Sequence, residues 1–311
     1  MTSAVAAPPL VRSETVVRPR RLVRAWAVVR LTRPWFWPLG WGGGAFGAVL
    51  ASGDWLPAAP AMAGTVAVGL VLGPFLWGFV FALNDLHDLP TDRRNPRKAT
   101  APLVTGVLTP ADLRRCAGWC AAGALVAAAV AGPVLLAGTA AVLVLGWLYS
   151  VPPVRLKARP GWDVTVNAVT VGVLGPLGGW ALHRPVLDYP PVLVVLGVLL
   201  GGALYLPTTV IDRAADRAAG CATAAVRWNA AACYRAGLAA WVLANAVWLA
   251  CCHLGVLVAR DGWLLQTITI PALVAVYAYL TRRPSIVRLA VVALAFAVPA
   301  TDFLVAYTRA G

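Results

Sequence analysis

Uninterrupted apolar segments dominate this chain, each close to the length of about 20 residues that an α-helix needs to cross a bilayer. Hydrophobic residues make up 60% of its 311 residues and charged residues only 12%, whereas soluble domains carry about 25% charged residues. This content excludes an intrinsically disordered chain and argues against a soluble enzyme. The six cysteines include no CxxC pair, so neither a disulfide scaffold nor a zinc site is indicated. The pattern therefore predicts an all-α, polytopic membrane protein.

Nine such segments can be marked, and several contain Gly and Pro, which membrane helices tolerate. The third and fourth meet at Gly132-Pro133, which predicts a tight helical hairpin. We expect one domain over residues 34–311, with nine transmembrane helices around a central cavity that opens to the cytoplasm and to lipid. The segments are Trp35–Ser52, Ala61–Leu83, Cys116–Gly132, Pro133–Val151, Val164–Leu182, Val192–Ile211, Ala236–Ala259, Trp263–Leu280 and Ile286–Tyr307.

A basic tail, residues 1–33, precedes the first segment and contains seven Arg. No apolar stretch typical of a secretory signal peptide stands ahead of the first span. The beginning of the tail, Met1–Thr15, is expected to be disordered. Its end, Arg20–Arg33, mixes Arg with Leu, Val and Trp. This part either lies along the membrane surface as an interfacial helix or serves as a solvated anchor.

Basic residues are distributed very unevenly between the two sides that nine spans define. All but three of the 26 Lys and Arg residues fall in the tail or in loops on the same side. Cytoplasmic loops carry such an excess. We therefore expect a multi-pass protein of the cell (inner) membrane, with a cytoplasmic N-terminus and an external C-terminus. This topology accounts for the basic excess, and no nucleic-acid partner is expected.

Five of the 12 acidic residues gather in two compact groups, at the ends of the second and sixth segments. Because each helical residue turns by about 100°, each group presents its carboxylates on one helix face. Pro90 is expected to bend or end the helix, which would leave the last acid of the first group on a loop. The first group is Asp85, Asp88 and Asp92, preceded by Asn84, and the second is Asp212 and Asp216.

Like charges at a membrane boundary are costly unless cations compensate them. Mg²⁺ is a hard cation that binds one or two carboxylates together with phosphate oxygens. Two facing acidic groups would therefore hold a diphosphate through Mg²⁺, and we expect two such ions. The metals would neutralise charge on a departing diphosphate. Neighbouring cations, among them Arg93, Lys98 and Arg213, could contact phosphate oxygens directly.

These motifs resemble those of the UbiA superfamily of intramembrane prenyltransferases. Asn84–Asp92 is similar to the family's NDxxDxxxD motif and Asp212–Asp216 to its DxxxD motif. The segment Tyr149–Lys157 resembles the YSxPPxRLK loop of the chlorophyll-synthase branch. The resemblance covers about residues 30–308, and it departs at Ala101-Pro102, where many relatives carry Arg-Pro. One phosphate contact is therefore either absent or supplied elsewhere, for example by Lys98.

The resemblance implies a Mg²⁺-dependent transfer of an isoprenoid group from an allylic diphosphate to an aromatic or otherwise lipophilic acceptor. It implies that Asp85, Asp88, Asp212 and Asp216 are catalytic, and that these four together with Asp92 are the metal ligands. The residues implied to contact the diphosphate are Asn84, Arg93, Lys98, Tyr149, Arg155, Lys157 and Arg213.

Two other functions remain open. An intramembrane terpene cyclase on the same scaffold would use the same acids but let the isoprenoid cation close on itself. A cation-coupled transporter is the less favoured alternative, because transporters place their ionisable residues near the membrane midplane. Here both acidic groups stand at the cytoplasmic ends of their segments.

Two polar residues lie inside the apolar segments themselves. A buried polar side chain in a membrane helix needs a partner. Asn167 in the fifth segment therefore either bonds across helices or lines the cavity. Asp302 in the ninth segment is expected to form an interhelical hydrogen bond.

The nine-span arrangement predicts that reporter fusions after Thr91 and after Arg309 report opposite sides of the membrane, because an odd number of spans separates the two positions. A pair of reporters, one active only in the cytoplasm and one active only outside, measures this directly. Activity on the same side for both fusions would contradict the arrangement.

Overall fold

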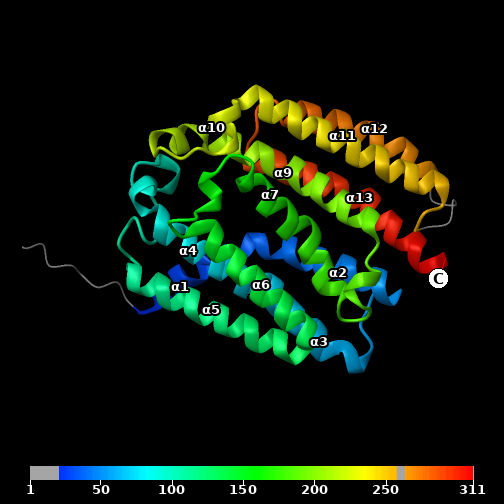
Figure 1. Cartoon of the computed structure of the whole chain (residues 1–311), viewed down its shortest axis with the longest axis horizontal. Coiled ribbons are helices and arrows are strands. Elements are labelled where there is room, and N and C mark those ends of the chain that lie inside the picture. The colour runs from blue at the N-terminus through cyan, green and yellow to red at the C-terminus, as the bar shows by residue number, and fades with distance from the viewer. Residues whose placement is uncertain (1–20, 258–262, 311) are drawn as a thin grey trace, which may run out of the picture.

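The computed structural model describes residues 21–257 and 263–310, and every regular element in these ranges is helical (Figure 1). Helices α3 to α6 lie on one side of the bundle and α9 with α11 to α13 on the other, while α2 and α7 run between them. The helices are α1 Arg21–Leu31, α2 Trp37–Ser52, α3 Met62–Leu70, α4 Leu76–Asp92, α5 Pro110–Ala131, α6 Pro133–Ser150, α7 Trp162–Val169, α8 Gly175–Trp180, α9 Pro191–Ala218, α10 Ala224–Trp228, α11 Ala230–Leu254, α12 Trp263–Leu280 and α13 Ile286–Ala310.

Each predicted apolar segment overlaps with a helix or with a pair of consecutive helices, and the end of the seventh, residues 258–259, lies outside the described residues. The predicted hairpin is present, because α5 ends at Ala131 and α6 begins at Pro133. Between them Gly132 adopts a φ of 123°, which favours glycine. Within the described residues, six helical stretches are long and apolar enough to cross a membrane. The all-α membrane fold is thus confirmed, while the count of nine spans stays a prediction.

The end of α4 differs from the prediction. Pro90 neither ends the helix nor leaves Asp92 on a loop, because α4 continues through it to Asp92. A proline removes only one N–H from the helical ladder. The helical backbone hydrogen bonding continues after Pro90, since Arg93 N donates to Leu89 O at 3.1 Å. All three acids of the first group therefore stand on one continuous helix.

Two spans are broken by short π-helical turns, Val71–Phe75 between α3 and α4 and Thr170–Leu174 between α7 and α8. The first contains Pro74 and a non-helical Gly73 with φ −97° and ψ −109°. The indole nitrogen of Trp41 donates to Gly69 O at 2.8 Å, one turn before this break. Such turns displace the side chains that follow them and are frequent at functional sites.

Helix α1 packs against α4 and α5. Its residues Ala27 and Leu31 are buried in an apolar cluster with Leu113 of α5. Arg24 Nη2 donates to both carboxylate oxygens of Asp112, at 2.8 and 2.7 Å. The end of the predicted basic tail is therefore a docked helix. Residues 1–20, which contain the stretch expected to be disordered, lie outside the described residues.

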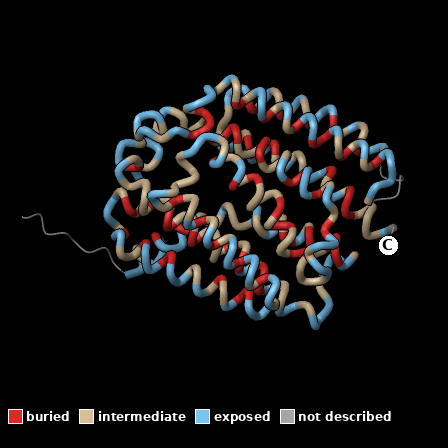
Figure 2. The backbone as a smooth tube through the Cα atoms, viewed as in Figure 1, coloured by how far each residue is buried: buried red, intermediate tan, exposed pale blue. Residues whose placement is uncertain are grey.

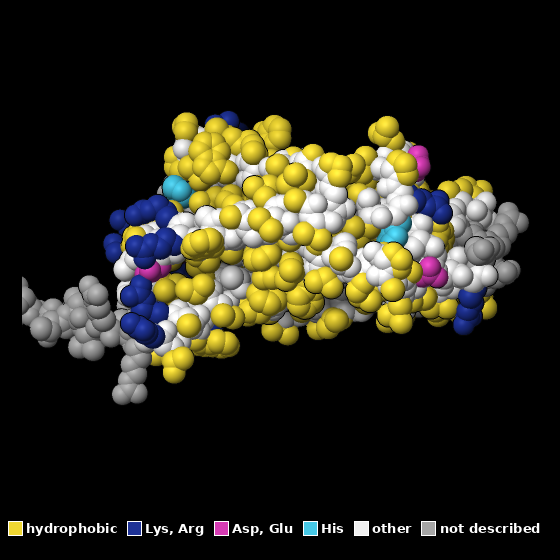
Figure 3. Space-filling view, turned by 90° about the horizontal axis from the view of Figure 1, so that it is seen from below, with side chains coloured by type: hydrophobic (Ala, Val, Ile, Leu, Met, Phe, Trp, Pro, Cys, Tyr) yellow, Lys and Arg dark blue, Asp and Glu magenta, His cyan; other side chains and the backbone are white. Residues whose placement is uncertain are grey.

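Buried side chains lie between the helices, and the outward faces are exposed (Figure 2). Many exposed side chains are large and apolar, such as Val126 at 68% and Leu294 at 70% exposure. Figure 3 shows apolar side chains over the middle of the molecule and charged ones towards the two ends of its long axis, with Lys and Arg concentrated at one of them. This distribution is typical of a protein whose middle faces lipid.

Helices α2 and α8 approach so closely that their contact requires glycine. A Cβ added at Gly47 would overlap the carbonyl oxygen of Pro176, and one added at Gly179 would overlap that of Gly44. Small residues allow this kind of backbone contact between membrane helices. The contact fixes α2 against the broken α7–α8 span, and both elements border the cavity described below.

The α2–α8 contact predicts that Gly47→Ala destabilises the protein by about 1–3 kcal/mol, the usual cost of overpacking. The matched control is Gly42→Ala in the same helix, where an added Cβ meets nothing within 4 Å. Thermal unfolding in detergent should show a lower melting temperature for Gly47→Ala and an unchanged or slightly higher one for Gly42→Ala. Equal melting temperatures for the two variants would contradict the prediction.

Candidate active site

The first acidic group lies along the last three turns of α4, where two of its carboxylates are buried. Asp85 and Asp92 are each 6% exposed. Lys98, in the loop that follows α4, joins them: its Nζ lies 3.1 Å from Asp85 Oδ1 and 3.3 Å from Asp92 Oδ2. The predicted contact residue Lys98 thus neutralises two predicted metal ligands at once.

The loop after α6 provides the cations for the third carboxylate of this group. Arg155 Nη2 lies 2.9 Å and Lys157 Nζ 2.8 Å from the two oxygens of Asp88. Lys157 Nζ also donates to Asn84 Oδ1 at 2.6 Å. Burial lowers the pKa of Lys157 from its ordinary value, and the neighbouring Asp88 opposes this effect. The predicted motif residues Asn84, Asp88, Arg155 and Lys157 therefore form one cluster.

Two consecutive prolines in this loop, Pro152 and Pro153, would by themselves favour an extended backbone, but the loop is not extended. The chain after α6 folds into consecutive turns, with a short 3-10 turn at Leu156–Ala158. Arg155 adopts a left-handed conformation with φ 40°, which is strained for a residue other than glycine. The ion pairs with Asp88 account for the difference, because they require both cations to turn inward. The Nε of Arg155 is buried and has no partner in the described part of the chain.

The second acidic group stands near the end of α9. Asp212 pairs with Arg97 from the loop after α4, and both side chains are about half exposed. Asp216 Oδ2 accepts a hydrogen bond from Thr223 Oγ1 at 3.0 Å. The Arg97–Asp212 pair thus connects the loop that follows the first group to the second group. The two groups stand near the ends of α4 and α9, which contact each other.

Arg33 is a site residue that the sequence analysis missed. Its Nη2 lies 2.9 Å from Asp85 Oδ1, and its guanidinium carbon lies 4.0 Å from the ring centroid of Phe81. Like Arg155, it has a positive φ, here 49°. One signal could have found it, namely an Arg-Pro pair directly ahead of the first span. Because basic residues are abundant on the predicted cytoplasmic side, Arg33 was interpreted only as part of the positive charge that sets the topology.

Two predicted contact residues lie apart from the ion pairs. Arg93 is exposed just after α4. Arg213 Nε donates to Ala225 O at 3.0 Å, which directs its guanidinium towards α10. Their predicted contact with a diphosphate remains a prediction.

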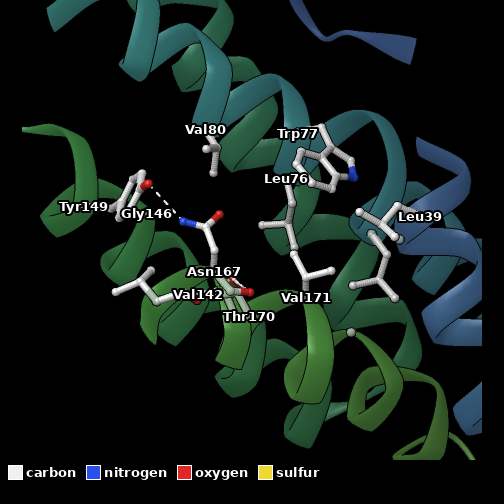
Figure 4. Close-up of a pocket in the computed structure, with 14 residues that line it drawn as sticks. Leu39, Leu76, Trp77, Val80, Val142, Gly146, Tyr149, Asn167, Thr170 and Val171 are labelled. Atoms are coloured by element: carbon white, nitrogen blue, oxygen red, sulfur yellow. Dashed lines mark hydrogen bonds between the residues drawn. The ribbon is translucent and has the colours of Figure 1, made fainter. Parts of the chain in front are cut away.

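An apolar cavity of about 110 Å³ lies between α2, α4, α6 and the broken α7–α8 span (Figure 4). Its polar end is formed by Tyr149, Asn167 and Thr170. Asn167 Nδ2 donates to Tyr149 Oη at 2.9 Å, and Tyr149 Oη lies 2.8 Å from Tyr205 Oη. Both alternatives for Asn167 therefore hold, since it bonds across helices and also lines the cavity. The cavity is further lined by Leu39, Gly40, Leu72, Leu76, Trp77, Val80, Val142, Gly146, Val166, Val171 and Gly175.

Two further acids have structural roles. Asp302 Oδ2 accepts from Gln266 Nε2 at 2.8 Å, which is the predicted interhelical hydrogen bond. Asp163 was not singled out from the sequence. It is 1% exposed, and it accepts from the backbone N–H of Ala224 and of Gly161 at 2.8 and 2.9 Å. It thereby joins the start of α7 to the start of α10.

The donor set suits Mg²⁺. Within the described residues, no three His, Cys, Asp or Glu side chains are close enough together to enclose a metal ion by themselves. Mg²⁺ does not require such a cage, because it takes one or two carboxylates and completes its octahedron with water and phosphate oxygens. The carboxylates of α4 and α9 supply hard oxygens, and the buried Nε of Arg155 is a charged donor without a partner. These features fit a magnesium diphosphate better than a lone ion.

Comparison with known sequences gives a family match over most of the chain. The model of the UbiA prenyltransferase family matches residues 35–297. A relative named homogentisate phytyltransferase, from Synechocystis sp. (strain ATCC 27184 / PCC 6803 / Kazusa), is 36% identical over 117 residues. That alignment covers 37% of this chain and 37% of the relative, so it spans little more than a third of either protein.

Solved structures share the fold along almost the whole chain. A UbiA homologue from Archaeoglobus fulgidus, solved with GPP and Mg²⁺, has a TM-score of 0.70 at 20% identity and aligns with 90% of this chain and 99% of its own. A digeranylgeranylglyceryl phosphate synthase has a TM-score of 0.68 at 16% identity, over 92% of this chain and 99% of its own. Together with the match to the family model, the shared fold places this chain in the UbiA prenyltransferase family.

Proposed function

We propose that this protein is a Mg²⁺-dependent intramembrane prenyltransferase. It moves an isoprenoid group from an allylic diphosphate to an aromatic or otherwise lipophilic acceptor. One observation carries the proposal. Leu76 and Val80 line the apolar cavity, and Asn84 and Asp88 follow on the same face of α4 at four-residue spacing. A substrate with a hydrocarbon tail and a charged head would match this succession of an apolar surface and a polar cluster.

The relatives support the nature of the donor and of the metal. The Archaeoglobus homologue was solved with GPP and Mg²⁺ and, separately, with DMAPP and Mg²⁺. Both organic ligands are allylic diphosphates. The Synechocystis relative is named as a phytyltransferase. We therefore assign an allylic isoprenyl diphosphate as the donor and Mg²⁺ as the cofactor. Two ions are proposed because the chain has two acidic groups.

The carboxylates of the two acidic groups would hold the metal, which supplies electrostatic stabilisation to the departing diphosphate. Arg155 and Lys157 would donate charge-assisted hydrogen bonds to phosphate oxygens. Lys98 and Arg33 keep the acids of α4 oriented through the ion pairs described above. Tyr149 marks the boundary between the diphosphate site and the cavity. The metal ligands in this assignment are Asp85, Asp88, Asp92, Asp212 and Asp216.

The apolar cavity would exclude water from the isoprenoid cation, which favours its capture by the acceptor over hydrolysis. Both substrates are lipophilic, so a site inside the membrane gives access to each of them. We place the protein in the cell (inner) membrane with its N-terminus and both acidic groups on the cytoplasmic side.

The test is a reconstitution with purified protein, allylic diphosphates of several chain lengths, Mg²⁺, and aromatic acceptors added or omitted. Acceptor-dependent release of diphosphate is the expected result. Acceptor-independent release together with a cyclic hydrocarbon product would favour the terpene cyclase instead. Absence of diphosphate release under every condition would contradict both enzymes.

Replacing a single carboxylate of either acidic group should strongly reduce turnover. We expect Asp88→Asn and Asp212→Asn each to lower kcat by at least about 100-fold, the scale of losing one electrostatic contact to a transition state. Excess chelator should have the same effect on the wild type, and added Mg²⁺ should reverse it. Asp54→Asn, at an exposed acid far along the chain from both groups, is the control with unchanged activity. Near-normal turnover in both site variants would contradict the assignment.

The loop after α6 should act on the donor rather than on the acceptor. Losing one charge-assisted contact costs about 1.5–3 kcal/mol. We therefore expect Arg155→Ala and Lys157→Ala each to reduce kcat/KM for the donor by roughly 10- to 150-fold. The KM for the acceptor should change little. Arg159→Ala, an exposed cation in the same loop, is the matched control. A double variant of Arg155 and Lys157 within twofold of wild type would show that the two residues are only topological anchors.

A further inference from the structure

Helix α1 presents an exposed apolar face on the side opposite to the bundle. Leu22, Trp26 and Val29 are 84%, 63% and 41% exposed. Because each helical residue turns by about 100°, these three side chains lie within about 60° of one another around the helix axis. Ala27 and Leu31, which are buried against α4 and α5, lie on the other side. The helix is therefore apolar on two sides, and the bundle covers only one of them.

Two arginines flank this exposed face. Arg21 and Arg30 are exposed and lie about 100° and about 80° to either side of Leu22. Among the described residues neither has a carboxylate partner, whereas Arg24, on the docked side, pairs with Asp112 at 2.7 Å. The exposed side of α1 thus combines a row of large apolar side chains with a cation on each edge.

Neither water nor the centre of a bilayer suits such a face. In water, the three large apolar side chains would form a contiguous exposed patch. With 11 residues, α1 is about 16 Å long and too short to cross a hydrocarbon core of about 30 Å. The headgroup layer suits both kinds of side chain, because the apolar ones reach the acyl chains while the arginines stay among the phosphates.

We propose that the exposed face of α1, formed by Leu22, Trp26 and Val29 with Arg21 and Arg30 at its edges, binds anionic lipid at the membrane surface. The two arginines select anionic over zwitterionic headgroups, because each attracts the net negative charge of such a lipid. The helix then lies between the bundle on one side and lipid on the other. No step of prenyl transfer enters this inference, which goes beyond the proposed function and does not depend on it.

The place of α1 in the molecule suits this role. Its Arg24 pairs with Asp112 in the first turn of α5, so α1 lies at the level where that span begins. Figure 1 shows α1 towards the end of the bundle at which α5 begins, and Figure 3 shows Lys and Arg concentrated at this end. Trp35, which follows α1 closely, is 62% exposed, and tryptophan is enriched at the level of the headgroups.

The lipid-binding face also adjoins the candidate active site. Helix α1 ends at Leu31, and Arg33, two residues later, pairs with Asp85. Lipid on one side and the bundle on the other hold the helix in place. The membrane therefore helps to fix the segment that supplies Arg33.

The experiment introduces a photoreactive diazirine amino acid at Leu22 or at Trp26 of the full-length protein, reconstituted in nanodiscs of phosphatidylcholine and phosphatidylglycerol. Mass spectrometry after illumination identifies what each position contacts. We expect lipid adducts at both positions. Thr100, an exposed polar residue in the loop after α4, is the control position and should react mainly with water. Mainly water adducts at both Leu22 and Trp26 would overturn the proposal, as would adducts to the protein's own chain or to a second copy.

The preference for anionic lipid has its own readout. At Trp26, we expect the ratio of phosphatidylglycerol to phosphatidylcholine adducts to exceed the ratio in the membrane about fivefold, the scale of one arginine near an anionic surface. Replacing both edge arginines, Arg21→Gln and Arg30→Gln, should bring this excess below about twofold. The matched control is Arg282→Gln with Arg283→Gln, which removes the same charge from exposed residues of another loop and should leave the excess unchanged.

Three results would contradict the anionic preference of α1. The first is a wild-type adduct ratio equal to that of the membrane, and the second is an undiminished excess in the Arg21/Arg30 variant. The third is an equal loss in the control variant, which would assign the preference to the net charge of the whole protein.

Diphosphate release, measured on the same nanodiscs, tests the proposed function separately. Lipid adducts at α1 without diphosphate release would retain the lipid-binding face and remove the transferase assignment. Diphosphate release without lipid adducts at α1 would retain the transferase assignment and remove the lipid-binding face.

Discussion

A carboxylate at the boundary of an apolar bundle must be paired, and the way this chain pairs its acids determines how the site is built. Asp85 is neutralised by Arg33 and Lys98, and Asp88 by Arg155 and Lys157. These cations come from three segments, namely the residues just before α2, the loop after α4 and the loop after α6, and all three are thereby fastened to the end of α4. Removing one partner of such a pair leaves an uncompensated charge, which is far more costly than losing an exposed pair. The half-exposed Arg97–Asp212 contact is the weaker connection.

Much of this arrangement could be predicted from the sequence. The helical segments, the hairpin at Gly132 and the two acidic groups follow from periodicity, turn chemistry and the scarcity of acids in an apolar chain. The partners of the acids could not be predicted, because ion pairing depends on tertiary proximity and basic residues are abundant on one side. Arg33 was missed for this reason. The likeness of the Tyr149–Lys157 loop to one family branch stays a prediction.

The shape of the cavity was also beyond sequence analysis. Gly73 and Pro74 indicate a break in the second span. Thr170–Leu174 contains no proline, and the hydrophobic periodicity alone predicts a continuous helix there. Both π-helical turns border the cavity, with Leu72 in the first and Thr170 and Val171 in the second. Without them the two spans would be regular helices with different side chains facing inward. The dimensions of the cavity thus depend on two local departures from helical regularity and on the close α2–α8 contact.

The ion pairs around α4 have a consequence for turnover. A polyanion that enters the site competes with carboxylates for the same cations, so its binding exchanges one set of charge contacts for another. The net affinity for such a polyanion would then be only the difference between the two sets, which would limit how tightly a diphosphate product is held. If Arg155 and Lys157 hold the diphosphate as proposed, they would pair with Asp88 again when it leaves. In the ligand-free protein, the Asp88 carboxylate thus occupies the two cations that the proposal assigns to the diphosphate.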